Sequence, residues 1–105
     1  MEQPNLNYID ELAGNDDDFR AKLVNTIKRE LPNEVTEYKN TINNSDFLTA
    51  ANHVHKLKHK ISVMGMEKSY YIAEEFEHNL KNHSADLRLE FENILTTMQN
   101  FADGL

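Results

Sequence analysis

Three of the five histidines in this 105-residue chain lie close together, at His53, His55 and His59. Histidine is the side chain that acts as a nucleophile near neutral pH without needing a lowered pKa. Lys58, His59 and Ser62 follow His55 at the spacings i+3, i+4 and i+7, which place side chains on one face of a helix. The sequence therefore predicts an outward patch of four polar side chains, with His55 as the candidate nucleophile.

The charge around this cluster is opposite in sign to that of the whole chain. The chain has 11 Lys+Arg and 18 Asp+Glu, a formal net charge of −7, which argues against a protein that binds nucleic acid by releasing counterions from phosphates. Residues 52–68 contain one acid, Glu67, and four lysines, at Lys56, Lys58, Lys60 and Lys68. We expect this basic segment to attract an acidic partner and to stabilise an anion added near His55, as phosphoryl transfer requires.

A metal site is the rival interpretation of the histidines. His55 and His59, at i and i+4, have a spacing that can chelate a transition-metal ion. The neighbouring lysines repel a cation, and no third ligand is evident nearby. Glu75 and His78 form half of a di-iron pattern, but the second Glu-x-x-His that such bundles require is absent. We therefore expect no bound metal.

Helices must position these side chains, because three glycines and two prolines are too few for a fold of many short strands. The spacing of apolar residues predicts one domain over residues 1–105, with helices at approximately 6–13, 16–43, 46–64, 67–82 and 85–102. The second helix is expected to be kinked near Pro32, which lacks an N–H group and clashes with the preceding turn. Ser45 and Ser84 are predicted to cap the third and fifth helices.

Each predicted helix has an apolar stripe. In the third helix the three-four spacing is regular, at Phe47, Ala50, Val54, Leu57, Ile61 and Met64. The stripes of the first two helices are expected to include Leu12 and Phe19, and Gly65 is placed to end the third. Four long amphipathic helices with short connections predict an all-α, antiparallel up-down four-helix bundle, with the short extra N-terminal helix across one end.

The residues around His55 resemble the histidine-containing phosphotransfer (HPt) domain family of two-component phosphorelays. The similarity lies in His55-x-Leu57-Lys58, followed by Gly65 ten residues after the histidine. The short first helix with its acidic turn, the Pro-bearing second helix, and an apolar-acidic pair in the fourth are also similar; these are Leu6 to Asp18, Leu31-Pro32 and Phe76-Glu77. The resemblance covers about residues 5–101.

This resemblance implies a phosphorelay intermediate. His55 would accept a phosphoryl group on a ring nitrogen from a receiver-domain aspartate and pass it to another such aspartate, while Lys58 helps to neutralise the group and the Glu77 carboxylate lies near the imidazole. The chain is then expected to be a phosphoryl carrier without ATP-dependent kinase activity or a cofactor of its own. Mg²⁺ is expected in the partner, a response-regulator receiver domain or a hybrid histidine kinase.

The spacing along the chain independently brings Glu77 toward His55. His55 lies ten residues before Gly65 and Glu77 twelve residues after it, so in an antiparallel pair of helices the two side chains lie at nearly the same height. A carboxylate that accepts a hydrogen bond from Nδ1–H would fix the tautomer and leave Nε2 free to attack phosphorus. Orientation of the imidazole is the predicted role of Glu77.

The sequence departs from the family pattern at His59, where the family commonly has glycine. A bulky His59 either narrows the choice of receiver or takes part in docking, for which Lys56, His59 and Ser62 are the predicted residues. The alternative function is a non-phosphorylated helical-bundle adaptor that binds receiver or kinase domains.

Other features of the sequence bear on the cellular compartment in which the protein is expected. The chain has no cysteine, so nothing indicates disulfides or an oxidising environment. It has no apolar run approaching the roughly 20 residues that a membrane span needs, and no signal peptide is recognisable at its N-terminus. We expect a cytoplasmic monomer that binds neither nucleic acid nor membrane.

Overall fold

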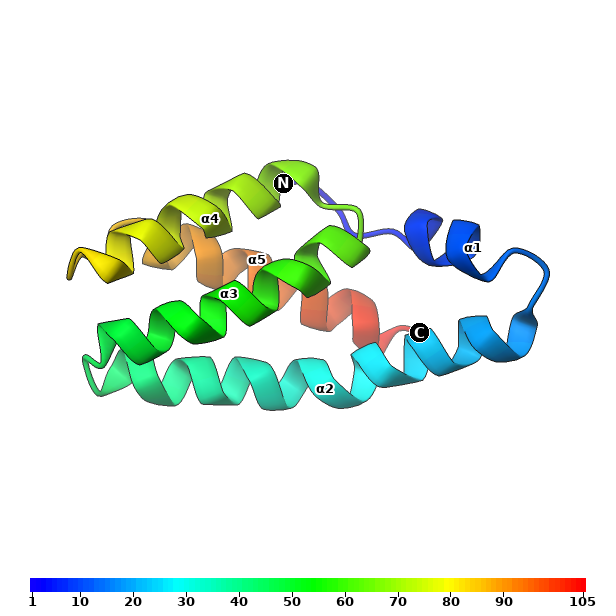
Figure 1. Cartoon of the computed structure of the whole chain (residues 1–105), viewed down its shortest axis with the longest axis horizontal. Coiled ribbons are helices and arrows are strands. Elements are labelled where there is room, and N and C mark those ends of the chain that lie inside the picture. The colour runs from blue at the N-terminus through cyan, green and yellow to red at the C-terminus, as the bar shows by residue number, and fades with distance from the viewer.

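The computed structural model describes all residues from 1 to 105 and contains five α-helices and no strands (Figure 1). The helices are α1 (Asn7–Ala13), α2 (Asp17–Asn43), α3 (Phe47–Val63), α4 (Glu67–Lys81) and α5 (Arg88–Asp103). The all-α prediction is confirmed, and each observed helix end lies within three residues of its expected position. No helix combines the length and the apolar character needed to cross a membrane.

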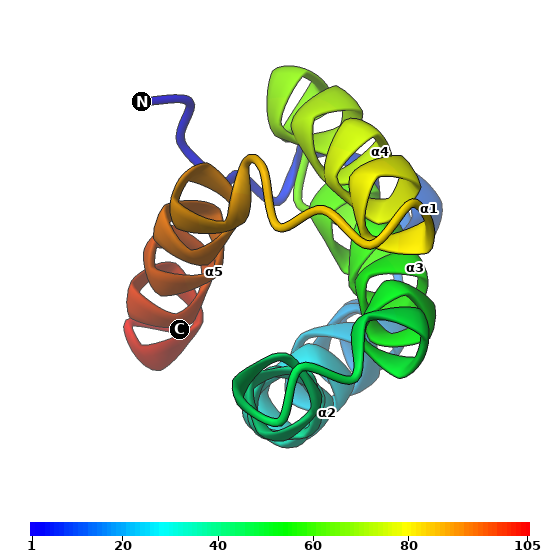
Figure 2. The ribbon, with the colours of Figure 1, turned by 90° about the vertical axis from the view of Figure 1, so that its left-hand side faces the viewer.

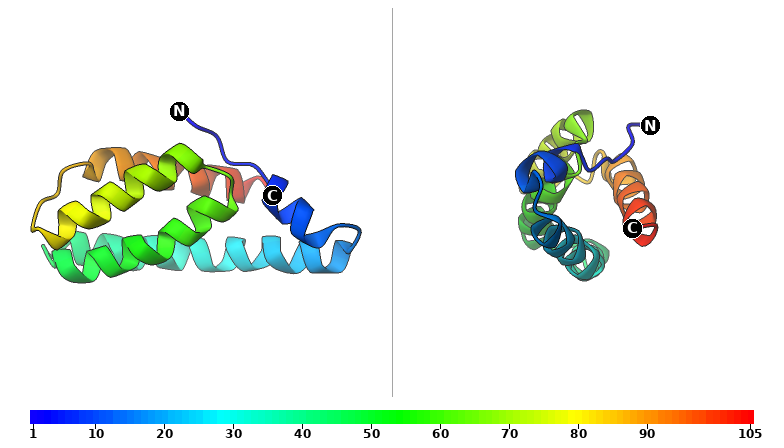
Figure 3. Two further views of the ribbon diagram at one scale, coloured as in Figure 1. Left: turned by 45° about the horizontal axis from the view of Figure 1, so that its top comes forward. Right: turned by 90° about the vertical axis from the view of Figure 1, so that its right-hand side faces the viewer.

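The four longer helices surround a common core. α2 and α4 each pack against both α3 and α5, an arrangement consistent with a helical bundle (Figure 2). The short α1 packs beside the first part of α2 (Figure 3). Amphipathic helices of this length gain most of their stability from burying one face against neighbours, so the apolar stripes decide which side chains point outward.

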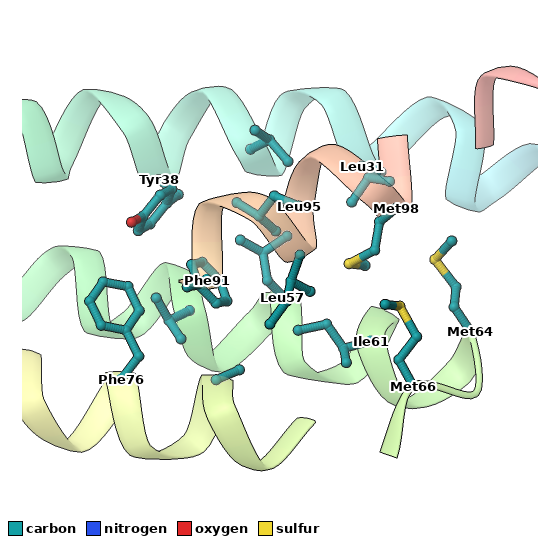
Figure 4. Close-up of a cluster of buried hydrophobic side chains, with 14 of the residues drawn as sticks. Leu31, Tyr38, Leu57, Ile61, Met64, Met66, Phe76, Phe91, Leu95 and Met98 are labelled. Atoms are coloured by element: carbon teal, nitrogen blue, oxygen red, sulfur yellow. The ribbon is translucent and has the colours of Figure 1, made fainter. Parts of the chain in front are cut away.

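Aromatic rings from three helices fill one part of the core. Tyr38 of α2, Phe76 of α4 and Phe91 of α5 are fully buried, and their ring centroids lie 5.1 to 6.3 Å apart in edge-on or tilted contacts (Figure 4). Leu57 and Ile61 of α3 point into the same core. The inward direction of these two side chains fixes the orientation of α3 and therefore the outward face that carries His55.

The predicted apolar stripes are wrong on both sides of the turn between α1 and α2, at the end of α1 and the start of α2. Leu12 is 53% exposed and Phe19 is 41% exposed, whereas Ile9 and Leu31 are fully buried. The physical reason is the length of α2, which has 27 residues and extends past the other long helices (Figure 1). Only the short α1 lies beside its first turns, so the stripe there is only partly covered.

α2 continues through Pro32 as one unbroken helix. Pro32 is exposed, so its ring lies on the solvent side of the bundle and the core on the other side of α2 stays continuous. The nearby Thr36 hydroxyl donates a hydrogen bond to the Pro32 carbonyl at 2.9 Å.

The predicted helix caps at Ser45 and Ser84 are also wrong. The residue that caps α3 is Asp46, whose side chain accepts a hydrogen bond from the Thr49 N–H at 3.3 Å, while Ser45 lies before it with φ +58°. Ser84 lies in a longer connection, and α5 begins only after Leu87, which has φ +75°. In both connections the chain needs a residue of left-handed backbone before it can enter the next helix.

The turn between α3 and α4 depends on a glycine, as the sequence predicted. Gly65 has φ +74°, a conformation that residues with a Cβ atom rarely adopt. A Cβ at this position would also lie only 2.6 Å from the Asn5 side chain. The backbone N–H of Asn5 donates to the Met64 carbonyl at 2.9 Å, so the start of the chain is fastened to this turn.

The N-terminal segment, residues 1–6, also caps α4. No side chain at the N-cap of α4 serves this purpose. The Glu2 carboxylate instead accepts hydrogen bonds from the backbone N–H groups of Lys68 and Ser69, at 3.1 and 2.8 Å. These bonds satisfy two of the free donors at the start of α4 and place a negative charge at the positive end of its dipole.

Candidate functional site

The outward face of α3 presents His55 to solvent. Val54 and Leu57, on either side of His55, are fully buried, and the His55 side chain itself is 57% exposed. This agrees with the position expected from the apolar stripe, at the border between core and water. An imidazole in this position can be reached by the active site of another protein.

Glu77 of α4 meets His55 from the neighbouring helix. Glu77 follows the buried Phe76 and is itself only 7% exposed, and its Oε1 lies 3.3 Å from His55 Nδ1. Burial raises the pKa of Glu77, but hydrogen bonds from Lys58 and Lys81, with a smaller contribution from His55, outweigh it and leave the pKa below its usual value. An ionised carboxylate only accepts hydrogen bonds, so this contact requires the proton on Nδ1, and in the neutral ring Nε2 then carries the free lone pair.

Lys58 is buried, which corrects its predicted place on the outward patch. The residue is 8% exposed, and its Nζ lies 2.9 Å from Glu77 Oε1 and 5.5 Å from the centre of the Tyr70 ring. α4 packs over this side of α3, so it covers the aliphatic stem of Lys58 while Glu77 binds the amine. In the free protein the charge of Lys58 is therefore already paired.

Lys81 is a member of this site that the sequence reasoning missed. Its Nζ lies 3.0 Å from Glu77 Oε2, and the two residues are four apart on α4. This Glu-to-Lys spacing is a known stabilising pair on helix surfaces, so the signal was present in the sequence. One carboxylate is thus surrounded by two lysines and one imidazole, and the ionised groups leave the cluster with one positive charge in excess.

The segment of residues 52–68 is less positive in the folded protein than its sequence suggests, because acids from other helices pair with its lysines. Lys60 Nζ lies 3.0 Å from Glu30 and 2.9 Å from Glu34, both on α2. Burial lowers the pKa of Lys60, but hydrogen bonds to these two carboxylates outweigh it and raise the pKa above its usual value. Two of the four lysines counted in the segment are therefore paired with acids from other helices.

The predicted docking residues Lys56, His59 and Ser62 are all exposed. The His59 ring stands edge-on to the His55 ring, with 5.5 Å between centroids and 88° between planes. Lys56 forms no ion pair. The structure therefore brings His55 and His59 together at the surface and places Lys58 beneath them with Glu77.

His59 separates two depressions in the surface. On one side, a hollow of about 470 Å³ lies between α3 and α4 and is lined by His59, Ser62, Gly65, Glu67, Tyr70 and Tyr71. On the other side, a mainly apolar groove of about 200 Å³ runs between α1, α2 and α3, with Tyr8, Leu12 and Val63 in its walls. Because the His55 and His59 rings lie 5.5 Å apart, a partner that contacts His55 would meet His59 and the edges of these depressions as well.

No group of three or more His, Asp or Glu side chains is arranged to hold a metal ion. Comparisons with protein-family models, with curated proteins and with solved structures found no match to this chain. The arrangement itself offers an exposed imidazole nucleophile, a buried carboxylate that orients it, and a net positive surrounding.

Proposed function

We propose that this chain is a phosphorelay intermediate that accepts a phosphoryl group on His55 from a receiver-domain aspartate and passes it to another receiver aspartate. The observation that carries the proposal is the exposed His55 ring, whose Nδ1 lies 3.3 Å from the buried and ionised Glu77. The proposal also includes the helix arrangement of the HPt family that the sequence resembles. This arrangement is an antiparallel up-down four-helix bundle, with α1 as a short extra helix.

The chemistry at His55 follows from the proton on Nδ1. The lone pair of Nε2 forms a bond to phosphorus while the bond from phosphorus to the aspartate oxygen breaks, and the carboxylate leaves with the electron pair. The ring keeps its Nδ1 proton and becomes positively charged. Glu77 faces this developing charge and stabilises it, in the orienting role that a third group has in a catalytic triad.

Lys58 and Lys81 serve the phosphoryl group at longer range. Their two charges exceed the single charge of Glu77 by one, so the cluster favours an added anion. The chain contributes a nucleophile and an electrostatic environment, and the partner contributes Mg²⁺ and most of the transfer catalysis. The protein is in this proposal a phosphoryl carrier and not an ATP-dependent kinase.

A non-phosphorylated adaptor is the second candidate. The observation that favours it is the bulk of His59, whose ring lies 5.5 Å from the His55 ring on the face that a receiver must approach. An adaptor would still bind receiver or kinase domains through the helix face that carries Lys56, His59 and Ser62.

Incubation with phosphorylated receiver domains and Mg²⁺ separates these two functions. A carrier gains phosphate that is labile to acid and stable to base, and His55→Gln abolishes the gain. His78→Gln, which removes an exposed histidine of α4, is the matched control and retains it. Binding of receivers without transfer from any of them would identify the adaptor.

A further inference from the structure

The face of α3 beside His55 carries a second imidazole that nothing else in the structure engages. His59 is exposed, lies one helical turn after His55, and takes part in no ion pair. Because Nδ1 of His55 is turned to Glu77, a phosphoryl group on Nε2 lies on the solvent side of the ring. His59 borders this side, at an i, i+4 spacing whose side chains are direct neighbours.

The lysines near His55 are less available than their number suggests. Lys58 and Lys81 are bound to the two oxygens of Glu77, at 2.9 and 3.0 Å, and Lys60 is bound to α2. Lys56 is free, but adjacent residues on a helix point about 100° apart, so it leaves α3 in another direction. Among the basic side chains of this segment, His59 is therefore the one that neighbours His55 on α3 and takes part in no ion pair.

We propose that His59, in its protonated form, donates a hydrogen bond to the phosphoryl group on His55. Its positive charge at the surface takes the place of the charge of Lys58, which is paired with Glu77. This inference rests on the proposed phosphoryl-carrier function and adds a phosphoryl-binding residue to it. His59, which stands where the HPt family commonly has glycine, is then part of the phosphoryl site.

The surroundings of His59 allow its charge to respond to the phosphoryl group. The other titratable or charged groups that line the depressions on its two sides are Tyr8 of α1, Glu30 of α2, Lys60 of α3, and Glu67, Tyr70 and Tyr71 of α4. Glu30 is already bound to Lys60. A dianionic phosphoryl group hydrogen-bonded to His59, with its phosphorus about 5 Å from the centre of the ring, should favour the protonated ring by about three- to tenfold in a largely aqueous, salt-screened setting.

The test follows the proton of His59 before and after His55 is phosphorylated. Phosphoramidate, a small phosphoryl donor, labels His55 without any receiver, and NMR records the imidazole signals from pH 5 to 8.5. We expect phosphorylation to move the titration midpoint of His59 upward by about 0.5 to 1 pH unit, which corresponds to the same three- to tenfold preference. The exposed His78 on α4 serves as the internal control and should not move.

A transfer equilibrium with a receiver supplies the second readout. Binding reciprocity requires that protonated His59 favours the phosphorylated carrier by the same factor. The quantity to measure is the equilibrium ratio of phosphorylated carrier to phosphorylated receiver. We divide the ratio found for the parent protein by the ratio found for His59→Gln. This quotient should be about three- to tenfold higher at pH 5.5 than at pH 8. His59→Lys, which keeps a positive charge at both values, should remove this pH dependence and retain the higher ratio.

Each negative result points to one conclusion. A His59 midpoint that moves by less than about 0.2 pH unit in chains shown to carry phosphate on His55 overturns the assignment of His59 alone. If the His59 midpoint shifts as expected but no receiver transfers phosphate to the chain, the role of His59 stands and the relay function is overturned. A His55 that gains no phosphate from phosphoramidate overturns both.

Discussion

Replacement of Glu77 by glutamine is expected to destabilise the fold and, if the proposed relay function holds, to impair transfer. Glu77→Gln keeps the size of the side chain and removes its charge. Lys58, with its side chain only 10% exposed, is then left without the carboxylate that lies 2.9 Å from its Nζ. A buried charge that loses its only oppositely charged partner is among the more costly changes in a protein interior.

The size of the effect follows from the two partners. Two charges about 4 Å apart at an effective dielectric constant of about 20 attract each other by roughly 4 kcal/mol. Loss of one partner of a buried pair typically costs about 3 to 5 kcal/mol, and Lys58 lies close enough to the surface to recover part of this by moving outward. The pair with Lys81 adds little, because that lysine is 56% exposed. We therefore expect a loss of about 2 to 3 kcal/mol.

Urea unfolding followed by circular dichroism measures this loss. With a slope of about 1.5 kcal/mol per molar urea, the midpoint should fall by about 1.3 to 2 M. Glu75→Gln, which removes an exposed and unpaired acid from the same helix, is the matched control and should change the midpoint little. Lys58→Met in the Glu77→Gln background removes the stranded charge and should restore most of the stability.

Acid provides an independent check on the same pair. The folded pKa of Glu77 is lowered, so its ionised form contributes stability that is present above the unfolded pKa, near 4.5, and is lost as pH falls through the folded value. Glu77→Gln should therefore be less sensitive to pH below about 4.5 than the parent protein. A loss below about 0.5 kcal/mol, or a double variant no more stable than Glu77→Gln, would refute the ion-pair reasoning.

Three further substitutions test the local structure. Gly65→Ala forces a Cβ into a backbone of φ +74° and to within 2.6 Å of a side chain of the N-terminal segment, so thermal denaturation should show a loss of about 1 to 3 kcal/mol; an unchanged melting temperature would contradict this. Asp46→Ala should cost about 1 kcal/mol in urea unfolding by removing the cap of α3, whereas Ser45→Ala should cost less than about 0.5 kcal/mol, and equal losses would restore Ser45 as the cap. Tyr38→Phe removes a hydroxyl that donates to a carboxylate of α5 at 3.0 Å, and chemical denaturation should show a loss of about 1 to 2 kcal/mol; a more stable variant would argue against that bond.

Periodicity and turn spacing were sufficient for the main features of the site. The regular stripe of α3 predicted that His55 lies at the border between core and solvent, and counting from Gly65 predicted that Glu77 lies near it. Both predictions use distances along one helix or across one short turn, where helix geometry leaves little freedom. The all-helical class followed in the same way from composition and spacing.

Most of the features that the sequence did not predict depend on contacts between helices. The sequence does not say on which side of α3 the next helix packs, so Lys58 was expected at the surface and lies instead beneath α4. The pairing of Lys60 depends on the position of α2, and the exposure of Phe19 depends on how far α2 extends beyond its neighbours. Lys81 is different, because its i, i+4 relation to Glu77 was readable from the sequence alone.

The hydrogen bonds of the N-terminal segment give the molecule a distinct order of assembly. Glu2 and Ser69 are 67 residues apart in the chain, whereas helices joined by short turns make contacts between near neighbours. The partners of the segment, at Met64, Lys68 and Ser69, lie around the turn between α3 and α4 and are in place only after these two helices have packed, so the segment is expected to dock after them. The amide protons of Lys68 and Ser69 should then exchange with solvent faster than those in the middle of α4, through undocking of the first six residues while the bundle stays folded.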